Sequence, residues 1–389
     1  MKEGYRLLGD FIRQVDVRNT DGKEENLLGV SVQKMFIPSI ANTVGTDFTK
    51  YKVVKRGQFT YIPDTSRRGD KIGIALLTDY DEGLVSNIYT VFEVKDENEL
   101  LPEYLMLWFS RPEFDRYARF KSHGSVREIM DWDEMCKVEL PVPSIDKQRS
   151  IVKAYQTITE RIELKRRIND NLEAKAQAVF QEQFASFYGA DELPDGYRII
   201  NLDNLCTVKG GKRLPADCKL LDTPTDHPYI RVRDVGSNRY VCLTNQFQYI
   251  DEETYSAISR YIVNTGDIVI SIVGTIGLLG KIHSSLDKAN LTENCVKLAN
   301  IHTVTSDYLY YTLCYKKQIK EIDLLTVGAV QAKLPMYNIQ SMKILVPPTK
   351  AIEAFQRKMN VLNEQIEANT VEIQKLYELE EVLLAKLSD

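Results

Sequence analysis

The sequence predicts a mixed α+β protein in which two similar β-rich α/β domains are separated by two long antiparallel coiled-coil helices, as a pseudo-two-fold tandem repeat. Three observations support this fold class. Sequence landmarks recur at an offset near 204 residues, each half of the chain ends in a long stretch without Pro or Gly, and the two stretches share one heptad register. A repeat of this length is two complete domains, because solenoid units have only roughly 20–45 residues.

The landmarks occur in the same order in both halves. Gly4–Leu8 matches Gly196–Ile200 at an offset of 192 residues, and later landmarks such as Tyr104 and Tyr308 settle at an offset of 204. Insertions between landmarks are expected in surface loops. The predicted parts are domain one at 1–143, a central spacer helix at 144–187, a linker at 188–196, domain two at 197–348 and a C-terminal helix at 349–389.

Both domains contain strand and helix patterns. Short β-branched and aromatic runs bounded by turn residues indicate strands, and an apolar run after a capping residue indicates a helix. The expected strands are Phe59–Ile62, Ile72–Leu77, Tyr89–Val94, Tyr229–Val235 and Asp267–Val273, and the expected helices are Leu101–Phe109 and Ser306–Glu321.

The two long helices share a heptad seam that needs a partner helix. Its exceptions include Lys165, Asn169 and Asn369 near the helix middles, and Gln183 at a later d position. If the helices pair antiparallel about their midpoints, the central polar residues face each other and fix the register. The expected interface residues are Ile151, Tyr155, Ile158, Ile162, Lys165, Asn169, Leu172 and Val179, with Phe355, Met359, Leu362, Ile366, Asn369, Ile373, Leu376 and Leu383.

Composition excludes several classes of protein. The chain has 389 residues, 43% of them hydrophobic, and a net charge of −5, so it is folded and any surface for a polyanion must be a local patch. Met1–Phe11 has no continuous apolar segment and no run reaches the roughly 20 residues of a membrane helix. The six cysteines form no C-x-x-C pair. We expect a cytoplasmic protein without a membrane segment, metal site or disulfide framework.

Two similar domains on antiparallel helices have an approximate two-fold axis, as duplex DNA does, and dimeric DNA-binding proteins use this symmetry to match spaced half-sites. Each seam covers about 33 residues, or roughly 50 Å at ~1.5 Å per residue. That length is on the order of one and a half turns of B-DNA. Because the two domains differ in sequence, the predicted DNA target is bipartite and asymmetric.

The sequence resembles the specificity subunits of type I restriction-modification systems over nearly its whole length. The resemblance rests on Gly210–Pro215, on Gly266–Ser271 with the following Val273–Gly277, on Gly124–Arg127, and on Leu140–Pro143 with Gln148 just beyond. Domain one lacks the Gly-Gly-Lys turn, and the second helix entry, Val346–Thr349, lacks the acidic-Gln pair that the family often has.

The resemblance implies two target recognition domains and two conserved helical regions. It also implies two adenine methyltransferase subunits and two restriction and translocase subunits as partners. S-adenosylmethionine, ATP and magnesium would then belong to those partners, and this chain would hold no cofactor and catalyse nothing. The sequence agrees, because it contains no P-loop, no dinucleotide-binding glycine motif and no Asn-Pro-Pro-aromatic segment.

Cationic and polar residues near turns are the candidate DNA contacts. Residues 197–348 hold 17 Lys and Arg against 14 Asp and Glu, and the glycines beside Lys212 could let the backbone approach phosphates. Arg127 and Gln331 occupy matching positions, and these side chain types pair with guanine and adenine edges. The candidates are Arg67, Arg68, Lys71, Lys121, Ser125, Arg127, Lys209, Gly210, Gly211, Lys212, Arg213, Arg231, Arg233, Thr275 and Gln331.

Each candidate contact has an alternative structural role. The Gly-Gly-Lys-Arg segment can be a solvated turn, Arg231 and Arg233 can be charges on one face of a strand, and the loop of Thr275 can be a packing turn. For the whole chain, the alternatives are a coiled-coil scaffold without sequence-specific DNA binding and a self-contained nuclease or methyltransferase. A scaffold needs no basic clusters at its loops, and a catalytic protein needs motifs that this sequence does not contain.

Overall fold

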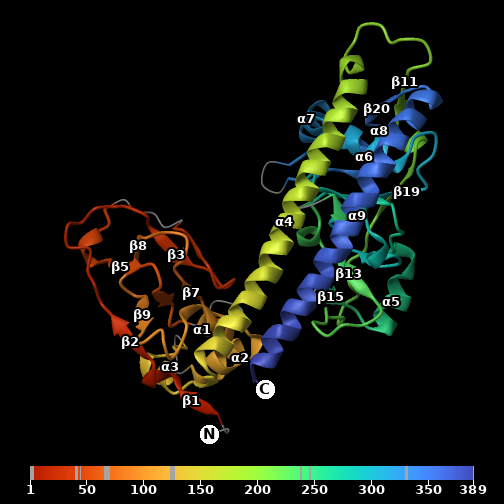
Figure 1. Cartoon of the computed structure of the whole chain (residues 1–389). Coiled ribbons are helices and arrows are strands. Elements are labelled where there is room, and N and C mark those ends of the chain that lie inside the picture. The colour runs from red at the N-terminus through yellow and green to blue at the C-terminus, as the bar shows by residue number, and fades with distance from the viewer. Residues whose placement is uncertain are drawn as a thin grey trace. The chain divides into compact units, whose positions relative to one another are not determined.

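The computed structural model describes residues 4–39, 43, 45–64, 71–122, 128–236, 239–244, 247–328 and 332–388. The chain forms two compact units (Figure 1). Unit 1 consists of residues 1–164 and 375–389, and unit 2 of residues 165–374. The long helices α4 (Ile145–Phe184) and α9 (Thr349–Ala385) each contribute one part to each unit.

Unit 1 contains short strands and three short helices besides its parts of α4 and α9. The strands are β1 (Tyr5–Leu7), β2 (Ile12–Val15), β3 (Leu28–Val30), β4 (Phe36–Pro38), β5 (Lys52–Lys55), β6 (Phe59–Tyr61), β7 (Ile74–Leu76), β8 (Glu82–Val85), β9 (Thr90–Val94) and β10 (Glu139–Pro141). The helices are α1 (Pro102–Phe109), α2 (Pro112–Lys121) and α3 (Trp132–Cys136).

Unit 2 repeats this order and adds elements between the repeated ones. The strands are β11 (Arg198–Asn201), β12 (Thr207–Gly210), β13 (Pro228–Ile230), β14 (Tyr240–Val241), β15 (Gln248–Tyr249), β16 (Ile268–Ser271), β17 (Leu279–Ile282), β18 (Asn290–Leu291), β19 (Cys295–Ala299) and β20 (Lys343–Val346). The helices are α5 (Glu252–Ile258), α6 (Ser306–Cys314), α7 (Lys316–Leu325) and α8 (Met336–Ser341).

The main sheets of the two units have the same strand order. In unit 1 the order is β2-β9-β6-β7, and in unit 2 it is β12-β19-β16-β17 followed by β14, which pairs parallel with β17. A small antiparallel pair joins the start and end of each domain, as β1-β10 and β11-β20. Unit 1 also has the pairs β3-β4 and β5-β8, and unit 2 has a three-stranded sheet β15-β13-β18. The predicted mixed fold with a tandem repeat is confirmed.

Equivalent hydrogen bonds mark the repeat at the level of single atoms. The Tyr104 hydroxyl donates to the carbonyl oxygen of Pro141 at 3.1 Å, and the Tyr308 hydroxyl donates to that of Leu345 at 2.6 Å. Both members of the second bond lie 204 residues after those of the first. The same bond therefore attaches α1 to β10 in unit 1 and α6 to β20 in unit 2.

The repeat begins at a different offset from the predicted one. The backbone N–H of Leu8 donates to Val138 at 2.8 Å, and that of Leu202 donates to Met342 at 2.9 Å. These equivalent bonds set the offset at 194 residues. The predicted offset of 192 is wrong by two residues, because a shared Gly-Tyr-Arg segment suggested an alignment that the strand pairing does not follow.

Each unit has its own aromatic core. In unit 1, the rings of Phe59 and Phe92 stack at 4.8 Å and Phe109 meets Phe59 edge-on at 5.8 Å. In unit 2, the ring centres of Phe180 of α4 and Phe355 of α9 are 6.0 Å apart. Burial of such rings is a large contribution to the stability of each unit.

The long helices follow from sequence stretches without Pro or Gly and with a repeated apolar stripe. The stripe leaves the predicted heptad register after Ala176. Phe180 and Phe184 are fully buried, whereas Val179 and Gln183 are only half-buried. A straight α-helix has 3.6 residues per turn and drifts from a strict heptad, so steps of four residues keep the stripe on the core. In the described part of the chain, no helix combines the length and apolarity needed to cross a bilayer.

A buried glutamine fixes the entry into α4. The Gln148 side chain accepts from the N–H of Leu101 at 2.8 Å and donates to the carbonyls of Glu99 at 2.8 Å and Pro143 at 2.9 Å. Three hydrogen bonds offset the burial of the amide. The equivalent residue in α9 is Ile352, which is buried among apolar side chains instead.

The end of the chain is attached to the beginning of unit 1. The Tyr5 hydroxyl donates to the carbonyl oxygen of Ser388 at 2.9 Å, and the Arg111 guanidinium contacts the Ser388 hydroxyl. Arg111 also stacks on the ring of Trp108 at 4.2 Å. Leu387 is buried in the core of unit 1. The last residues of the sequence are therefore part of unit 1.

Two predicted elements differ from the structure. The expected strand Tyr229–Val235 ends at Ile230, and Val232–Asp234 forms a 3-10 turn. The expected helix Ser306–Glu321 is two helices, because α6 ends at Cys314 and α7 begins at Lys316. Helical periodicity continues across this break, so the sequence pattern alone did not indicate it.

Candidate DNA interface

A glycine-rich loop follows β16 in unit 2 and leads into β17. Gly274 and Gly277 have φ angles of 82° and 80°, which favour glycine. The Ser271 hydroxyl donates to the carbonyl oxygen of Thr275 at 2.6 Å and accepts from the N–H of Leu278 at 2.9 Å. Ser271 therefore holds both arms of the loop, and Thr275 is exposed at its tip.

A second loop lies beside the first one. Val327 and Lys333 exchange two backbone hydrogen bonds of 2.8 Å and close the loop between them. Val273 pairs with Lys333, and the N–H of Leu334 donates to the carbonyl oxygen of Ile272 at 3.0 Å. The backbone of unit 2 thus brings the flanks of the two loops together. The predicted contact Gln331 lies outside the described residues.

Unit 1 uses the same anchor. The N–H of Met130 donates to the carbonyl oxygen of Pro63 at 3.0 Å, and Asp64 pairs with Ile129. Ile129 and Met130 lie 204 residues before Lys333 and Leu334, and Pro63 and Asp64 lie 209 residues before Ile272 and Val273. The four residues of unit 1 are therefore the repeat equivalents of the four in unit 2. In unit 1 the segment after β6 is therefore joined to the segment before α3. In unit 2 the segment after β16 is joined in the same way to the segment before α8.

Several predicted contacts lie between these anchored segments in the sequence of unit 1. The predicted residues that lie outside the described part of the chain are Arg67, Arg68, Ser125 and Arg127. Lys71 is exposed. Lys121 ends α2, with its Nζ 4.0 Å from the Glu134 carboxylate and 5.9 Å from the centre of the Tyr117 ring. Of the predicted cations of unit 1, Lys71 and Lys121 are the two that lie in the described part of the chain.

The Gly-Gly-Lys-Arg segment is built differently from the expected phosphate-binding turn. The N–H of Gly211 donates to Cys295 at 3.0 Å and that of Lys212 donates to Leu291 at 2.8 Å. A Cβ atom on Gly211 would collide with the carbonyl oxygens of Leu291 and Thr292, whereas Gly210 has open space. The expectation of a free backbone at Gly211 is wrong, because this glycine serves a close approach between strands.

The side chains of this segment still form a cationic surface. Lys209 and Lys212 are exposed. Arg213 is 80% exposed, and its Nε donates to the Glu293 carboxylate at 2.7 Å. Burial would raise the pKa of Glu293, but hydrogen bonds from Arg213, Thr292 and the backbone hold it below its usual value. Glu293 is therefore anionic and competes with any phosphate for Arg213.

The sequence predicts that Arg231 and Arg233 lie on one face of a strand. The structure contradicts this expectation. The Asp234 carboxylate accepts from the backbone N–H of Arg231 at 2.8 Å and from its Nε at 3.3 Å. This capping turns the chain away from β13. The Arg231 side chain is 17% exposed and also bonds Gln248, whereas that of Arg233 is 59% exposed. Of the two, Arg233 is the accessible cation.

Lys333 is a cation that sequence reasoning missed. It is exposed and lies at the junction of the two loops of unit 2. Its repeat equivalent is Ile129, so the comparison of the two halves gave no sign of a shared charge. A search for cations beside the predicted reading loop would have found it.

The predicted helix interface residues are all buried or half-buried. The buried residues are Ile158, Ile162, Phe355, Met359, Leu362, Ile366 and Asn369. The half-buried ones are Ile151, Tyr155, Lys165, Asn169, Leu172, Val179, Ile373, Leu376 and Leu383. In unit 1, Tyr155 also donates a hydrogen bond to Glu380, another polar residue of the seam.

Within the described ranges, no group of three or more His, Cys, Asp and Glu side chains is arranged to hold a metal ion. What the structure presents is two pairs of anchored segments with nearby cations, an arrangement suited to contacts with phosphates and base edges.

Comparison with known proteins identifies the family. Residues 11–174 and 194–382 match the family described as "Type I restriction modification DNA specificity domain". The chain belongs to the type I restriction-modification DNA specificity family. The two matched segments cover the two repeats, and DNA specificity is favoured over the alternative of a coiled-coil scaffold.

Individual relatives agree with this membership. The chain is 21% identical to the type I restriction enzyme HindI specificity subunit of Haemophilus influenzae, over 98% of this chain and 97% of that protein. It is 22% identical to the MjaIX specificity subunit of Methanocaldococcus jannaschii, over 74% of this chain and 68% of that protein. The crystal structure of the S subunit of the type I restriction-modification system from M. genitalium has the same fold. It gives a TM-score of 0.50 at 15% identity and covers 99% of this chain and 96% of that one.

Proposed function

We propose that this chain is the non-catalytic DNA-specificity subunit of a type I restriction-modification complex and binds an asymmetric, bipartite site in double-stranded DNA. The observation that supports this proposal is the duplicated anchor of two loops, with Met130 bonded to Pro63 in unit 1 and Leu334 bonded to Ile272 in unit 2. The same frame presents different loop sequences in the two units. Two similar frames with different loops suit two different half-sites.

The loops divide into residues that read bases and residues that hold phosphates. Arg127 and Gln331 are the proposed readers, since Arg pairs with guanine and Gln with adenine through two hydrogen bonds. Thr275 and Ser125 can approach base edges from the neighbouring positions. The cations proposed for phosphates are Arg67, Arg68, Lys71, Lys121, Lys209, Lys212, Arg213, Arg233 and Lys333. Phosphate contacts position the protein but do not specify sequence.

The proposed division of the chain follows from this function. Residues 1–143 and 197–348 are the two target recognition domains, 144–187 and 349–389 are the helical regions, and 188–196 is the linker. The partners are two methyltransferase subunits, which methylate adenine, and restriction and translocase subunits. S-adenosylmethionine, ATP and magnesium are bound by those partner subunits.

Genome-wide mapping of methylated adenine tests the proposal. Cells with and without the gene, each expressing the methyltransferase partner, are compared. We expect one split, asymmetric motif to be methylated only when this chain is present. An unchanged methylation pattern, or loss of a continuous palindromic motif, contradicts the proposal. Binding of the assembled complex to DNA should also weaken steeply with salt, because cations on the protein release counterions from the DNA.

A further inference from the structure

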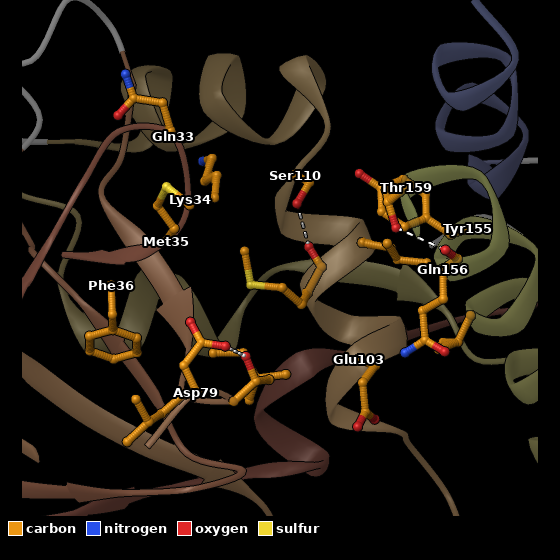
Figure 2. A pocket seen from close by; sticks show the side chains of 16 residues that line it. Gln33, Lys34, Met35, Phe36, Asp79, Glu103, Ser110, Tyr155, Gln156 and Thr159 are labelled. Atoms are coloured by element: carbon orange, nitrogen blue, oxygen red, sulfur yellow. Dashed lines mark hydrogen bonds between the residues drawn. The ribbon is translucent and has the colours of Figure 1, made fainter. Parts of the chain in front are cut away.

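Unit 1 has a cleft of about 410 Å³ beside α1 and the beginning of α4. Figure 2 shows Gln33–Phe36 on one side of it and Tyr155 and Thr159 of α4 on the other. Glu103 of α1 lines the cleft with an exposed carboxylate. Among the residues that the structure describes, Glu103 has no hydrogen-bond or ion-pair partner, and Lys34, which also lines the cleft, is paired with Asp115 at 2.5 Å.

The same place in unit 2 is filled by an arginine of the chain itself. Arg239 directly precedes β14 and is 4% exposed. Its guanidinium contacts the Asp307 carboxylate, donates to the Tyr311 hydroxyl at 3.0 Å and to Asn363 Oδ1 at 2.5 Å. It also lies over the ring of Tyr310, 5.6 Å from its centre. The buried charge is thus paired and hydrogen-bonded, as burial of a charge requires.

The residues around Arg239 are the repeat equivalents of residues that line the cleft. The pairs, each 204 residues apart, are Glu103 and Asp307, Leu107 and Tyr311, and Thr159 and Asn363. The acidic residue is kept in both units. Among the described residues of unit 1, no cation is bonded to Glu103 as Arg239 is bonded to Asp307 in unit 2.

The neighbouring sheet edge shows the same difference. In unit 2 the N–H of Lys281 in β17 donates to the carbonyl oxygen of Arg239 at 2.7 Å, which begins the pairing with β14. The equivalent of Lys281 is Leu76 of β7. Lys281 pairs with Ile268 of β16, and Leu76 pairs with Phe59, the equivalent residue of β6. In the described part of unit 1, β7 is the last strand of its sheet.

The Leu76 amide is oriented for an added strand. The next residue, Leu77, donates its N–H to Gln58 on the β6 side. Because successive amides of a strand point in opposite directions, the N–H of Leu76 points to the outer edge of the sheet. Addition of an extended peptide to such an edge is a common mode of recognition.

We propose that the cleft of unit 1 binds an extended segment of a partner polypeptide, which pairs with β7 as β14 pairs with β17 and places an arginine against Glu103. Asp79 also lines the cleft and adds negative charge beside it. Because Arg239 fills the equivalent place in unit 2, each copy of this chain offers the partner one such cleft. This inference goes beyond DNA recognition and does not depend on it.

The chain itself supplies the probe for a test. A synthetic peptide with the sequence of residues 236–241 carries the arginine and the first residues of β14, and a second peptide replaces Arg239 by Gln. Each is titrated into the full chain with isotope-labelled methionine methyl groups, because Met35 and Met106 line the cleft. We expect the arginine peptide to shift both methyl signals and the Gln peptide to bind about tenfold more weakly or worse, since a charge-assisted bond is lost.

Variants of the chain locate the binding site. Glu103→Gln should weaken the arginine peptide by about tenfold or more, and Glu97→Gln, an exposed carboxylate outside the cleft, should not. Equal binding of both peptides, or no shift of Met35 and Met106 at millimolar peptide, overturns the proposal. Binding seen only after Arg67→Gln and Arg68→Gln also overturns it, because the chain's own segment would then be the occupant. None of these readouts involves DNA, so the inference and the proposed function fail separately.

Discussion

Lys165 donates from its Nζ to the Oδ1 of Asn369 at 2.9 Å, and the two residues hold the same position of the repeat, 204 residues apart. A residue that contacts its own equivalent marks the axis of a self-complementary interface. Asn369 also donates to Asn169 at 2.9 Å, and Lys165 pairs with Glu372 at 2.9 Å. In unit 2, this polar group fixes the register of α4 against α9.

Removing one partner of this group should destabilise unit 2. Asn369→Leu leaves the half-buried Lys165 with fewer hydrogen bonds, and we expect a loss of about 1 kcal/mol in the free energy of unfolding. Adding Lys165→Leu should recover that loss, because paired apolar residues stabilise a coiled-coil core. Thermal unfolding measures both effects, with the solvent-facing Glu364→Leu of α9 as control. A rise in Tm for Asn369→Leu alone would show that the polar group does not act as a unit.

The two adjacent glycines of β12 and its extension should differ in their tolerance of a side chain. Gly211→Ala forces a Cβ against the carbonyls of Leu291 and Thr292, and we expect it to destabilise the protein by about 1–3 kcal/mol or more. Gly210→Ala has open space and should change stability by less than about 0.5 kcal/mol. Differential scanning calorimetry compares the two variants directly. Equal effects would contradict the structural role of Gly211.

The Glu293 carboxylate should weaken DNA binding. Glu293→Gln frees Arg213 and removes a negative charge beside it, so the affinity of the assembled complex for DNA should rise at low salt. Fluorescence anisotropy over a series of salt concentrations measures both the affinity and its salt dependence. Glu253→Gln, an exposed acid on α5, is the matched control. If both variants bind equally, the effect is one of net charge and not of Arg213.

Unit 2 should lose stability in acid through Asp307. Burial raises the pKa of this carboxyl, but Lys281, Arg239 and side-chain hydrogen bonds outweigh burial and lower it from 3.8 to about 2. Because the pKa is depressed, the ionised carboxylate stabilises the fold at pH values above its pKa in the unfolded chain. This stabilisation of about 2 kcal/mol is lost as the pH falls from about 4 to 2.

Hydrogen exchange of residues 306–314 against pH measures this loss. Asp307→Asn should remove the acid transition and destabilise unit 2 already at neutral pH by about 3 kcal/mol, because two buried cations lose their carboxylate. An unchanged acid transition in Asp307→Asn would assign it to another group.

Arg127→Ala should relax recognition at one base. If Arg127 reads a guanine, its loss should cost about 1–3 kcal/mol in discrimination at that position while the rest of the motif is kept. Methylation profiling measures the motif, and Arg13→Ala, a surface arginine paired with Glu93, serves as control. Full-strength methylation of an unchanged motif would reject Arg127 as a reader.

Sequence patterns predicted the parts of the fold that depend on periodicity. The absence of Pro and Gly and the apolar stripe gave the two helices, and repeated landmarks such as Tyr104 and Tyr308 gave the duplication. The pattern failed where one side chain redirects the backbone. Asp234 accepts from the N–H of Arg231 and ends β13 early, and a single carboxylate leaves no periodic signal.

The candidate site was only partly predictable for a similar reason. Gly211 looked like a phosphate-binding glycine because sequence cannot show which backbone lies against it. The burial of Arg239 was not predicted, because it depends on Asp307 and Asn363, which are distant in sequence. Contacts between such residues become evident only when the two units are compared in three dimensions.

The hydrogen bond between Tyr5 and Ser388 has a consequence for synthesis on the ribosome. Unit 1 combines residues 1–164 with residues 375–389, which are translated only after all of unit 2. Unit 1 therefore cannot complete its packing until residues 375–389 have left the ribosome. A stop codon introduced at residue 375 would therefore damage the part of the protein that is made earliest.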